Sequence, residues 1–142
     1  MALQFNDFLK YGNNSIINGF ITKCMSGANN ALRVYPSTVA YPSSPPPDYW
    51  SIPAGHILTY TGLTYSLSNN DTIIISAGNV NATATAAGTL SWFMFINDTS
   101  VPVHMFISDS ITLAGGGGVL TVNTLTPTSG QNVSINFSLK LI

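Results

Sequence analysis

Within the last eleven residues of the chain, 132–142, apolar and polar side chains alternate without interruption from Asn132 to Leu141. The apolar positions are Val133, Ile135, Phe137, Leu139 and Leu141. Successive side chains of a β-strand point to opposite faces, so this alternation predicts a long strand with one buried and one solvated face. The rest of the chain must therefore supply a core that receives this apolar face.

Short strands are also predicted upstream, separated by Gly, Asn and Asp turn signals. The expected ranges are 32–35, 56–60, 63–67, 72–76, 80–86, 89–96, 103–108, 111–113 and 119–122. Strands at this spacing are typical of an antiparallel β-sandwich or jelly roll. The segment 90–96 is apolar on both faces, which predicts a central strand covered on both sides.

The four glycines at 115–118 stand between two of the predicted strands. No Lys-Ser/Thr pair follows them, and a strand is expected where a phosphate loop would need a helix. We therefore interpret this glycine run as the flexible tip of a hairpin.

Residues 1–30 differ from the rest of the chain because their apolar residues follow a helical period. One helix face would carry Ile16, Ile17, Phe20, Ile21, Cys24 and Met25. An earlier turn with Phe5, Phe8 and Leu9 predicts a second short helix. We expect a mainly β protein in which this N-terminal helical segment, 1–30, and a β-sandwich, 31–142, form a single domain, with the helix over one face of the segment 90–96.

The segment 41–50 reads Tyr-Pro-Ser-Ser-Pro-Pro-Pro-Asp-Tyr-Trp. Three consecutive prolines favour an extended polyproline conformation and exclude a central strand. One interpretation is a stiff surface loop. The other is an arm laid along a neighbouring subunit, because rigid segments lose little entropy on docking and aromatic residues such as Tyr49 and Trp50 are typical anchors.

The charge of the chain is low. Charged residues make up 6% of the sequence, Glu is absent and the formal net charge is −1. Four scattered cations cannot neutralise a run of phosphates, so no nucleic-acid partner is expected. Residues 1–10 have no basic region and no uninterrupted apolar run, so we expect no secretory signal there. No apolar run is long enough to span a bilayer, so no membrane partner is expected. A surface with so few charges favours packing against copies or partners.

Candidate metal-binding and nucleophilic residues are sparse. Neither His56 nor His104 has a second ligand nearby at metal-binding spacing. Cys24 is the single cysteine, so it forms no internal disulfide, and on an apolar helix face it is expected to pack as a small hydrophobic residue. We expect no catalytic residue, no cofactor and no metal.

The remaining polar and aromatic candidates have plain structural interpretations. Asp71, Asp98 and Asp109 lie at predicted turns, where Asp bonds its own backbone, and a calcium site built from two such turns is the alternative. Sugar stacking is conceivable for Tyr49, Trp50, Tyr60 and Tyr65. Packing in the core or between subunits is the more common use of such aromatic residues, and it is the use expected here.

A resemblance to a known family is carried by residues 87–98, Ala-Gly-Thr-Leu-Ser-Trp-Phe-Met-Phe-Ile-Asn-Asp. This run resembles a strand and turn of small tailed-bacteriophage virion structural proteins, in which Gly-Thr-x-x-Trp-Phe leads to a short polar turn. The segments 106–108, 117–122 and 130–135 follow in the order seen in that family, and the N-terminal helix and Pro-rich loop match its layout. The family turn commonly holds Asp-Gly, whereas this chain has Asn-Asp-Thr-Ser at 97–100, so the turn geometry is expected to differ.

The resemblance implies a structural part of a phage particle. The first expectation is a capsid decoration (cement) protein that bridges subunits of the major capsid protein; the alternative is a tail- or baseplate-associated adaptor or a receptor- or carbohydrate-binding module. The chain is expected to form a homo-oligomer such as a trimer, to be made in the host cytoplasm and to reside in the virion, on the capsid surface rather than the tail. The expected contact residues are Leu3, Phe5, Phe8, Pro45, Pro46, Pro47, Tyr49 and Trp50.

Overall fold

The computed structural model describes the backbone of residues 3–5, 30–42, 53–61, 63, 66–68, 72–75, 80–96 and 105–140. Within these ranges the protein is mainly β: the strands form two sheets, and no helix occurs there. The helix predicted over residues 16–25 lies outside the described residues. The coarse fold class that the sequence predicted is therefore confirmed for the part of the chain that is described.

Sheet A contains five strands, all antiparallel to their neighbours. Their order across the sheet is β1 (Leu3–Phe5), β8 (Met105–Ser108), β7 (Leu90–Ile96), β2 (Ala31–Pro36) and β3 (Leu58–Thr61). The strand β7 is central, as its apolar sequence predicted, and it pairs with β2 over its whole length.

Sheet B is organised around β11 (Asn132–Lys140), the strand predicted from the C-terminal alternation. One edge of β11 pairs with β10 (Leu120–Val122), which is followed by β9 (Ile111–Leu113). The other edge is shared by β6 (Asn81–Thr83) and β5 (Thr72–Ile75), and β4 (Ser66–Ser68) pairs with β5. At nine residues, β11 is long enough to serve three partner strands.

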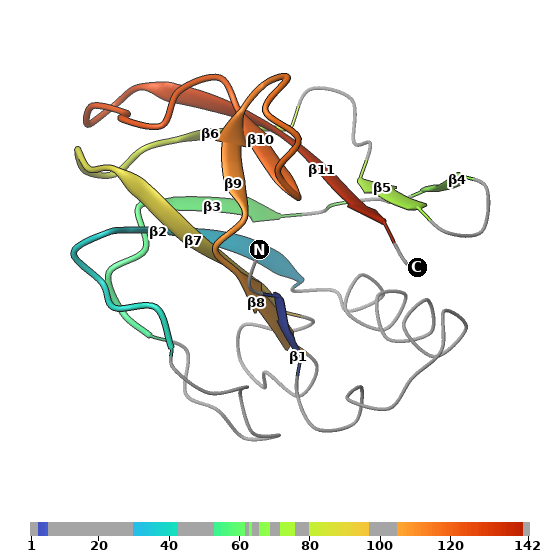
Figure 1. Ribbon diagram of the computed structural model, residues 1–142. Coiled ribbons are helices and arrows are strands. Elements are labelled where there is room, and N and C mark those ends of the chain that lie inside the picture. Colours follow the sequence, from blue (N-terminus) through green and yellow to red (C-terminus); the bar gives the residue numbers. More distant parts are fainter. Residues whose placement is uncertain are drawn as a thin grey trace.

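The two sheets share one hydrophobic core. Sheet A contributes Phe93 and Phe95, and their rings meet Phe137 of sheet B edge-on, with centroids 5.9 and 6.2 Å apart. Figure 1 shows β11 and β10 above β7, β2 and β3, with this core between them. Along β11, Val133, Ile135 and Phe137 are buried while the residues between them are not, which confirms the predicted alternation up to residue 137.

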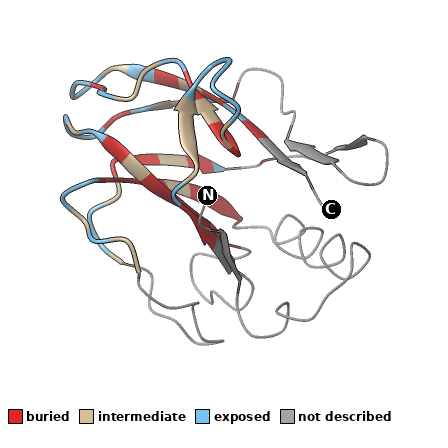
Figure 2. Ribbon diagram, viewed as in Figure 1, coloured by how far each residue is buried: buried red, intermediate tan, exposed pale blue. Residues whose placement is uncertain are grey.

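A second buried cluster lies on the outer face of sheet A, meaning the face that points away from sheet B. Its members are Ala31, Tyr35, Trp92, Met94, Ile96 and Ile107, with Val39 and Tyr41 packed against them. Every residue from 92 to 96 is buried, so β7 is covered on both faces, as predicted (Figure 2).

Two expectations from the sequence are wrong. Phe5 was placed in a short helix, but it belongs to β1, because pairing with Phe106 on β8 overrides the local helical pattern. The glycine run was expected to form a hairpin tip, but β9 and β10 are parallel.

A loop of six residues, 114–119, suffices for this parallel connection because each strand is only three residues long. The loop folds back closely over Thr112. A Cβ on Gly116 would lie 2.7 Å from the Thr112 Cβ, and one on Gly118 would lie 2.8 Å from its Oγ1. Gly118 N also donates a hydrogen bond to that Oγ1 at 3.0 Å. Close packing against Thr112 therefore explains Gly116 and Gly118, while Gly115 and Gly117 have positive φ values of +88° and +78°, which favour glycine.

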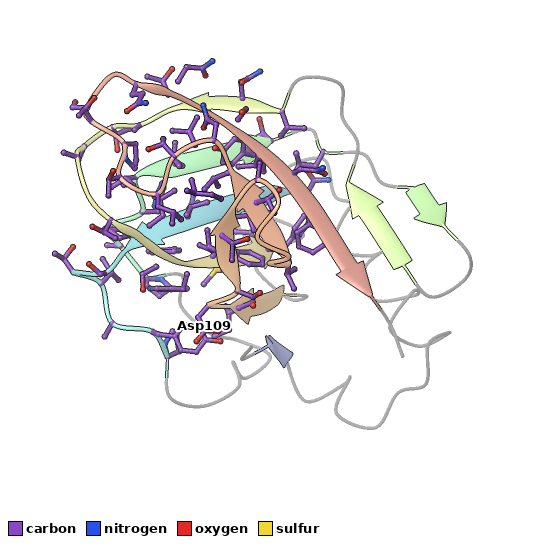
Figure 3. The ribbon with its side chains drawn as sticks, turned by 45° about the horizontal axis from the view of Figure 1, so that its top comes forward. Asp109 is labelled. Carbon is purple, nitrogen blue, oxygen red and sulfur yellow. The ribbon has the colours of Figure 1, made fainter. Side chains whose placement is uncertain are left out.

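Most strand boundaries differ from the predicted ranges by one to three residues. For example, β3 begins at Leu58 although residues 56–60 were predicted, and β6 covers only Asn81–Thr83 of the predicted 80–86. Asp109 lies in the exposed turn between β8 and β9, as its turn chemistry predicted (Figure 3). There, Ile111 N donates a hydrogen bond to the Asp109 carbonyl oxygen.

Candidate interaction site

A buried aromatic pair, Tyr35 on β2 and Trp92 on β7, marks the outer face of sheet A. The two residues are direct partners in the antiparallel register, and their rings stack with centroids 4.0 Å apart and 5° between planes. Both side chains have an exposed fraction of 0%. Such aromatic pairs contribute about 0.5–1.5 kcal/mol beyond the burial of their area. The pair is therefore a buried, well-packed part of this face.

The polar atoms of this pair hold both ends of the Pro-rich segment. The Tyr35 hydroxyl donates a hydrogen bond to the Pro53 carbonyl oxygen at 2.9 Å. Trp92 Nε1 donates to the Val39 carbonyl oxygen at 2.9 Å, and the Tyr41 ring packs edge-on against the Trp92 ring with centroids 5.8 Å apart. The chain thus enters and leaves the Pro-rich segment at one place on the sheet.

His56 reaches the same face from the segment before β3. Ile57 N donates a hydrogen bond to the Val34 carbonyl oxygen at 3.0 Å, which lays this segment along β2. Ile57 enters the core between the sheets, while the His56 ring meets the Tyr35 ring edge-on with centroids 5.9 Å apart. Arg33 lies two residues before Tyr35 on β2 and therefore shares its face. We call Arg33, Tyr35 and His56 the Arg33 cluster.

Burial sets the protonation states within the Arg33 cluster. It raises the pKa of the Tyr35 phenol to about 12, although the charge of Arg33 and a hydrogen bond to its side chain oppose the shift. Burial, and then the positive charge of Arg33, lower the pKa of His56 below its ordinary value of 6.5. At neutral pH the phenol is therefore protonated and the imidazole is neutral, so the positive charge of the cluster resides on Arg33.

Two nitrogen atoms of the Arg33 cluster lack a hydrogen-bond partner among the described residues. They are Nε of Arg33 and Nδ1 of His56, and both atoms are buried. Burying a polar group without a partner costs about 1–3 kcal/mol, so such atoms are rare in folded proteins. The cluster therefore has unused hydrogen-bonding capacity.

The outer face of sheet B differs in character, because hydroxyl and amide side chains cover it. A shallow hollow with a volume of about 140 Å³ lies there over β10 and β11, and its walls include Thr121, Asn123, Ser134 and Asn136. Some of these groups already bond within the sheet: Asn123 Oδ1 accepts from Ser134 N at 3.1 Å, and Thr121 Oγ1 donates to the Asn136 carbonyl oxygen at 3.4 Å. The rest of its lining is apolar and comes from Ala114, Val122 and Ile135, so the hollow offers neutral hydrogen-bonding groups beside apolar surface and no charge.

The structure places only part of the predicted contact set. Leu3 and Phe5 lie in β1, at the edge of sheet A. The other predicted contact residues lie outside the described residues: Phe8, Pro45, Pro46, Pro47, Tyr49 and Trp50. The Arg33 cluster was missed from the sequence. Its signal was the alternation of Leu32-Arg33-Val34-Tyr35, which places the arginine and the tyrosine on one face of a strand.

Some of the residues considered for metal binding, nucleophilic chemistry or sugar stacking lie within the described part of the chain, and others lie outside it. Tyr60 is buried in the core, as packing predicted, and His56 is half-buried beside Tyr35. Tyr65, His104 and Cys24 lie outside the described residues.

The described residues contain neither a metal-binding cluster nor a membrane-spanning helix. No group of three or more His, Cys, Asp or Glu side chains is close enough there to hold a metal ion. None of the described residues forms a helix of the length and hydropathy needed to cross a membrane.

No family model, curated protein or solved structure matches this chain.

Proposed function

We propose that this chain is a structural protein of the tailed-bacteriophage virion, namely a capsid decoration protein with a β-sandwich fold of jelly-roll type. The proposal rests on the resemblance of residues 87–98 to phage virion proteins, on the low charge of the chain and on the two sheets with a common core. It assigns no catalytic residue and no cofactor. The partner is the major capsid protein, and the site of action is the capsid surface.

The observation that carries this proposal is that the stacked pair of Tyr35 and Trp92 binds the chain at both ends of the Pro-rich segment. Tyr35 holds Pro53, while Trp92 holds Val39 and contacts Tyr41. A segment whose two ends are held on a buried, stacked pair is presented from a fixed point of the sheet. The prolines within it restrict its conformations further, which lowers the entropy lost on docking. This is the arrangement that a contact arm needs.

The mechanism would be mechanical. A decoration protein stabilises a shell when each copy buries surface on more than one capsid subunit, so that separating the subunits also requires breaking these contacts. An interface of about 800 Å² per partner, repeated by the symmetry of a homo-oligomer such as a trimer, is sufficient. Contacts through apolar and neutral polar groups would also depend little on salt.

The test is co-sedimentation of the recombinant protein with purified expanded phage heads that lack it. We expect saturable binding in a stoichiometry that matches the shell lattice. Deleting residues 45–50 should abolish binding, and the milder double variant Tyr49→Ala/Trp50→Ala should weaken it. Asn136→Asp, on the exposed outer face of sheet B, is the matched control and should bind as the wild type does. Circular dichroism checks that each variant is folded.

Two results would overturn parts of the proposal. If the folded deletion variant bound heads as tightly as the wild type, the arm would not be the contact element. If the wild-type protein ignored heads but joined purified tails, the decoration role would be wrong and the tail- or baseplate-associated role would replace it.

A second candidate, a carbohydrate-binding module on a tail, is favoured by the hollow on sheet B. Its hydroxyl and amide groups lie beside the apolar surface of Ala114, Val122 and Ile135, and they can hydrogen-bond neutral sugar hydroxyl groups. A glycan array tests it: binding that is lost in Asn123→Ala, a variant at the hollow, would support this function. Loss in Trp50→Ala alone would instead place the sugar on the arm.

A further inference from the structure

The Arg33 cluster combines one charge with two unpaired nitrogen atoms, next to the apolar cluster on the outer face of sheet A. Arg33 is the one cation whose side chain is described, and the neighbouring positions of its row across sheet A are Met94 on one side and Thr59 on the other. Neither neighbour is an acid. Among the described residues, neither cross-strand neighbour therefore pairs this half-buried guanidinium with a carboxylate, and burying such a charge unpaired is costly.

We propose that the Arg33 cluster is a carboxylate-binding site. The side of the guanidinium that carries Nε presents two parallel N–H groups, which match the two oxygens of a carboxylate. The unpaired Nε of Arg33 would supply one of these bonds, and the unpaired Nδ1 of His56, in its protonated form, would supply another. Tyr35 contacts both residues: the His56 ring meets its ring edge-on, and the Arg33 side chain hydrogen-bonds its hydroxyl.

The charge of the cluster selects the class of anion. A single guanidinium beside a neutral imidazole balances one negative charge, which suits a carboxylate better than a doubly charged phosphate. The site stands beside Pro53, one end of the Pro-rich segment, and that segment contains one acid, Asp48. The carboxylate can therefore be supplied by a free small acid or by the chain's own Asp48. The inference does not depend on a role in a phage particle.

The test uses nuclear magnetic resonance of the two histidines, with His104→Gln made first so that the His56 signals stand alone. Sodium acetate is titrated in at constant ionic strength against sodium chloride. We expect a saturable shift of the His56 ring signals and a rise in the pKa of His56, because a bound anion favours the imidazolium. Arg33→Gln should weaken acetate binding at least about tenfold. Arg33→Lys keeps the charge without the paired donors, so its affinity for acetate should lie between those of the wild type and of Arg33→Gln.

The outcomes separate the sources of the carboxylate. If Asp48→Asn lowers the pKa of His56 and increases the response to acetate, the chain's own carboxylate fills the site. If Asp48→Asn changes neither, a free acid is the ligand. Two results would overturn the assignment. In the first, acetate shifts the His56 signals no more than chloride does, both in the wild type and in Asp48→Asn. In the second, acetate shifts these signals equally in the wild type and in Arg33→Gln. Arg33→Lys provides the comparison if Arg33→Gln does not fold.

Discussion

The hydroxyl of Tyr60 on β3 donates a hydrogen bond to the main-chain carbonyl oxygen of Val133 on β11, at 2.9 Å, and so links sheet A to sheet B. The two residues are 73 positions apart, and both are buried, Tyr60 with an exposed fraction of 2%. Because the bond lies away from water, it satisfies a polar group that no solvent molecule would otherwise reach. It also fixes the position of one sheet over the other.

Tyr60→Phe should therefore destabilise the protein by about 0.5–1.5 kcal/mol, since it removes a buried hydrogen bond that links the two sheets. Urea unfolding followed by circular dichroism measures this loss. Thr121→Val is the matched control, because its hydroxyl also bonds a strand carbonyl but does so at an exposed site. It should cost well under 1 kcal/mol. If both variants lost the same free energy of unfolding, the buried bond between the sheets would stabilise the protein no more than an exposed one.

Alkaline pH should destabilise the protein through its buried tyrosines. The pKa of Tyr35 rises from 10.0 to about 12, and burial also raises the pKa of Tyr60. In the unfolded chain these phenols ionise near pH 10, so the folded state binds more protons above that pH. Their contribution to stability is complete below pH 10.0 and is lost as the pH rises toward the folded pKa.

The measurement is the free energy of unfolding from urea titrations across this pH range, with spectrophotometric titration of the phenols. Tyr35→Phe should show a shallower decrease between pH 10.0 and about 12 than the wild type does. A variant that loses stability with the same slope would show that Tyr35 titrates normally in the folded protein.

Much of this fold could be predicted from the sequence because hydrophobic period dominates strand formation. The alternation along residues 132–137 predicted which side chains of β11 are buried, and the two-sided apolar segment 90–96 predicted the centre of sheet A. Pairing with a distant partner was not predictable in this way. Strand β1 forms because its residues pair with β8, more than 100 positions away, and the parallel pairing of β9 with β10 depends on where the glycine loop packs.

The site was harder to predict, because it depends on register. Nothing in the local sequence says that Tyr35 stands opposite Trp92, or that the segment before β3 carries His56 to the same face. From the sequence we predict that the Pro-rich segment is a contact element, and the co-sedimentation experiment tests this prediction. The sequence could not show that both ends of that segment are held by the same two aromatic side chains.

The core between the sheets should be most sensitive at Phe137, which is fully buried against Phe93 and Phe95. Phe137→Ala should cost about 3–5 kcal/mol, because it removes a ring that both sheets contact and leaves a cavity. Leu113→Ala is the control, since this side chain is 48% exposed at the edge strand β9, and its loss should be far smaller. Chemical denaturation of both variants tests this, and a similar cost at the two positions would contradict the assigned core.

The turn before His56 depends on a glycine with two separate requirements. Gly55 has a φ of +96°, and a Cβ there would lie 2.8 Å from Cγ2 of Val39. Gly130 has a similar φ of +84° but open space around the added atom. Gly130→Ala should therefore show only the backbone cost of about 1–2 kcal/mol, whereas Gly55→Ala should add a packing cost of about 1–3 kcal/mol.

The double variant Gly55→Ala/Val39→Ala separates these two costs. Removing the Val39 methyl groups relieves the close contact, so adding Gly55→Ala to Val39→Ala should cost no more than Gly130→Ala does alone. Thermal unfolding of the four variants completes this comparison. If Gly55→Ala lowered stability no more than Gly130→Ala does, the contact between an added Cβ at position 55 and Val39 would carry no energetic cost.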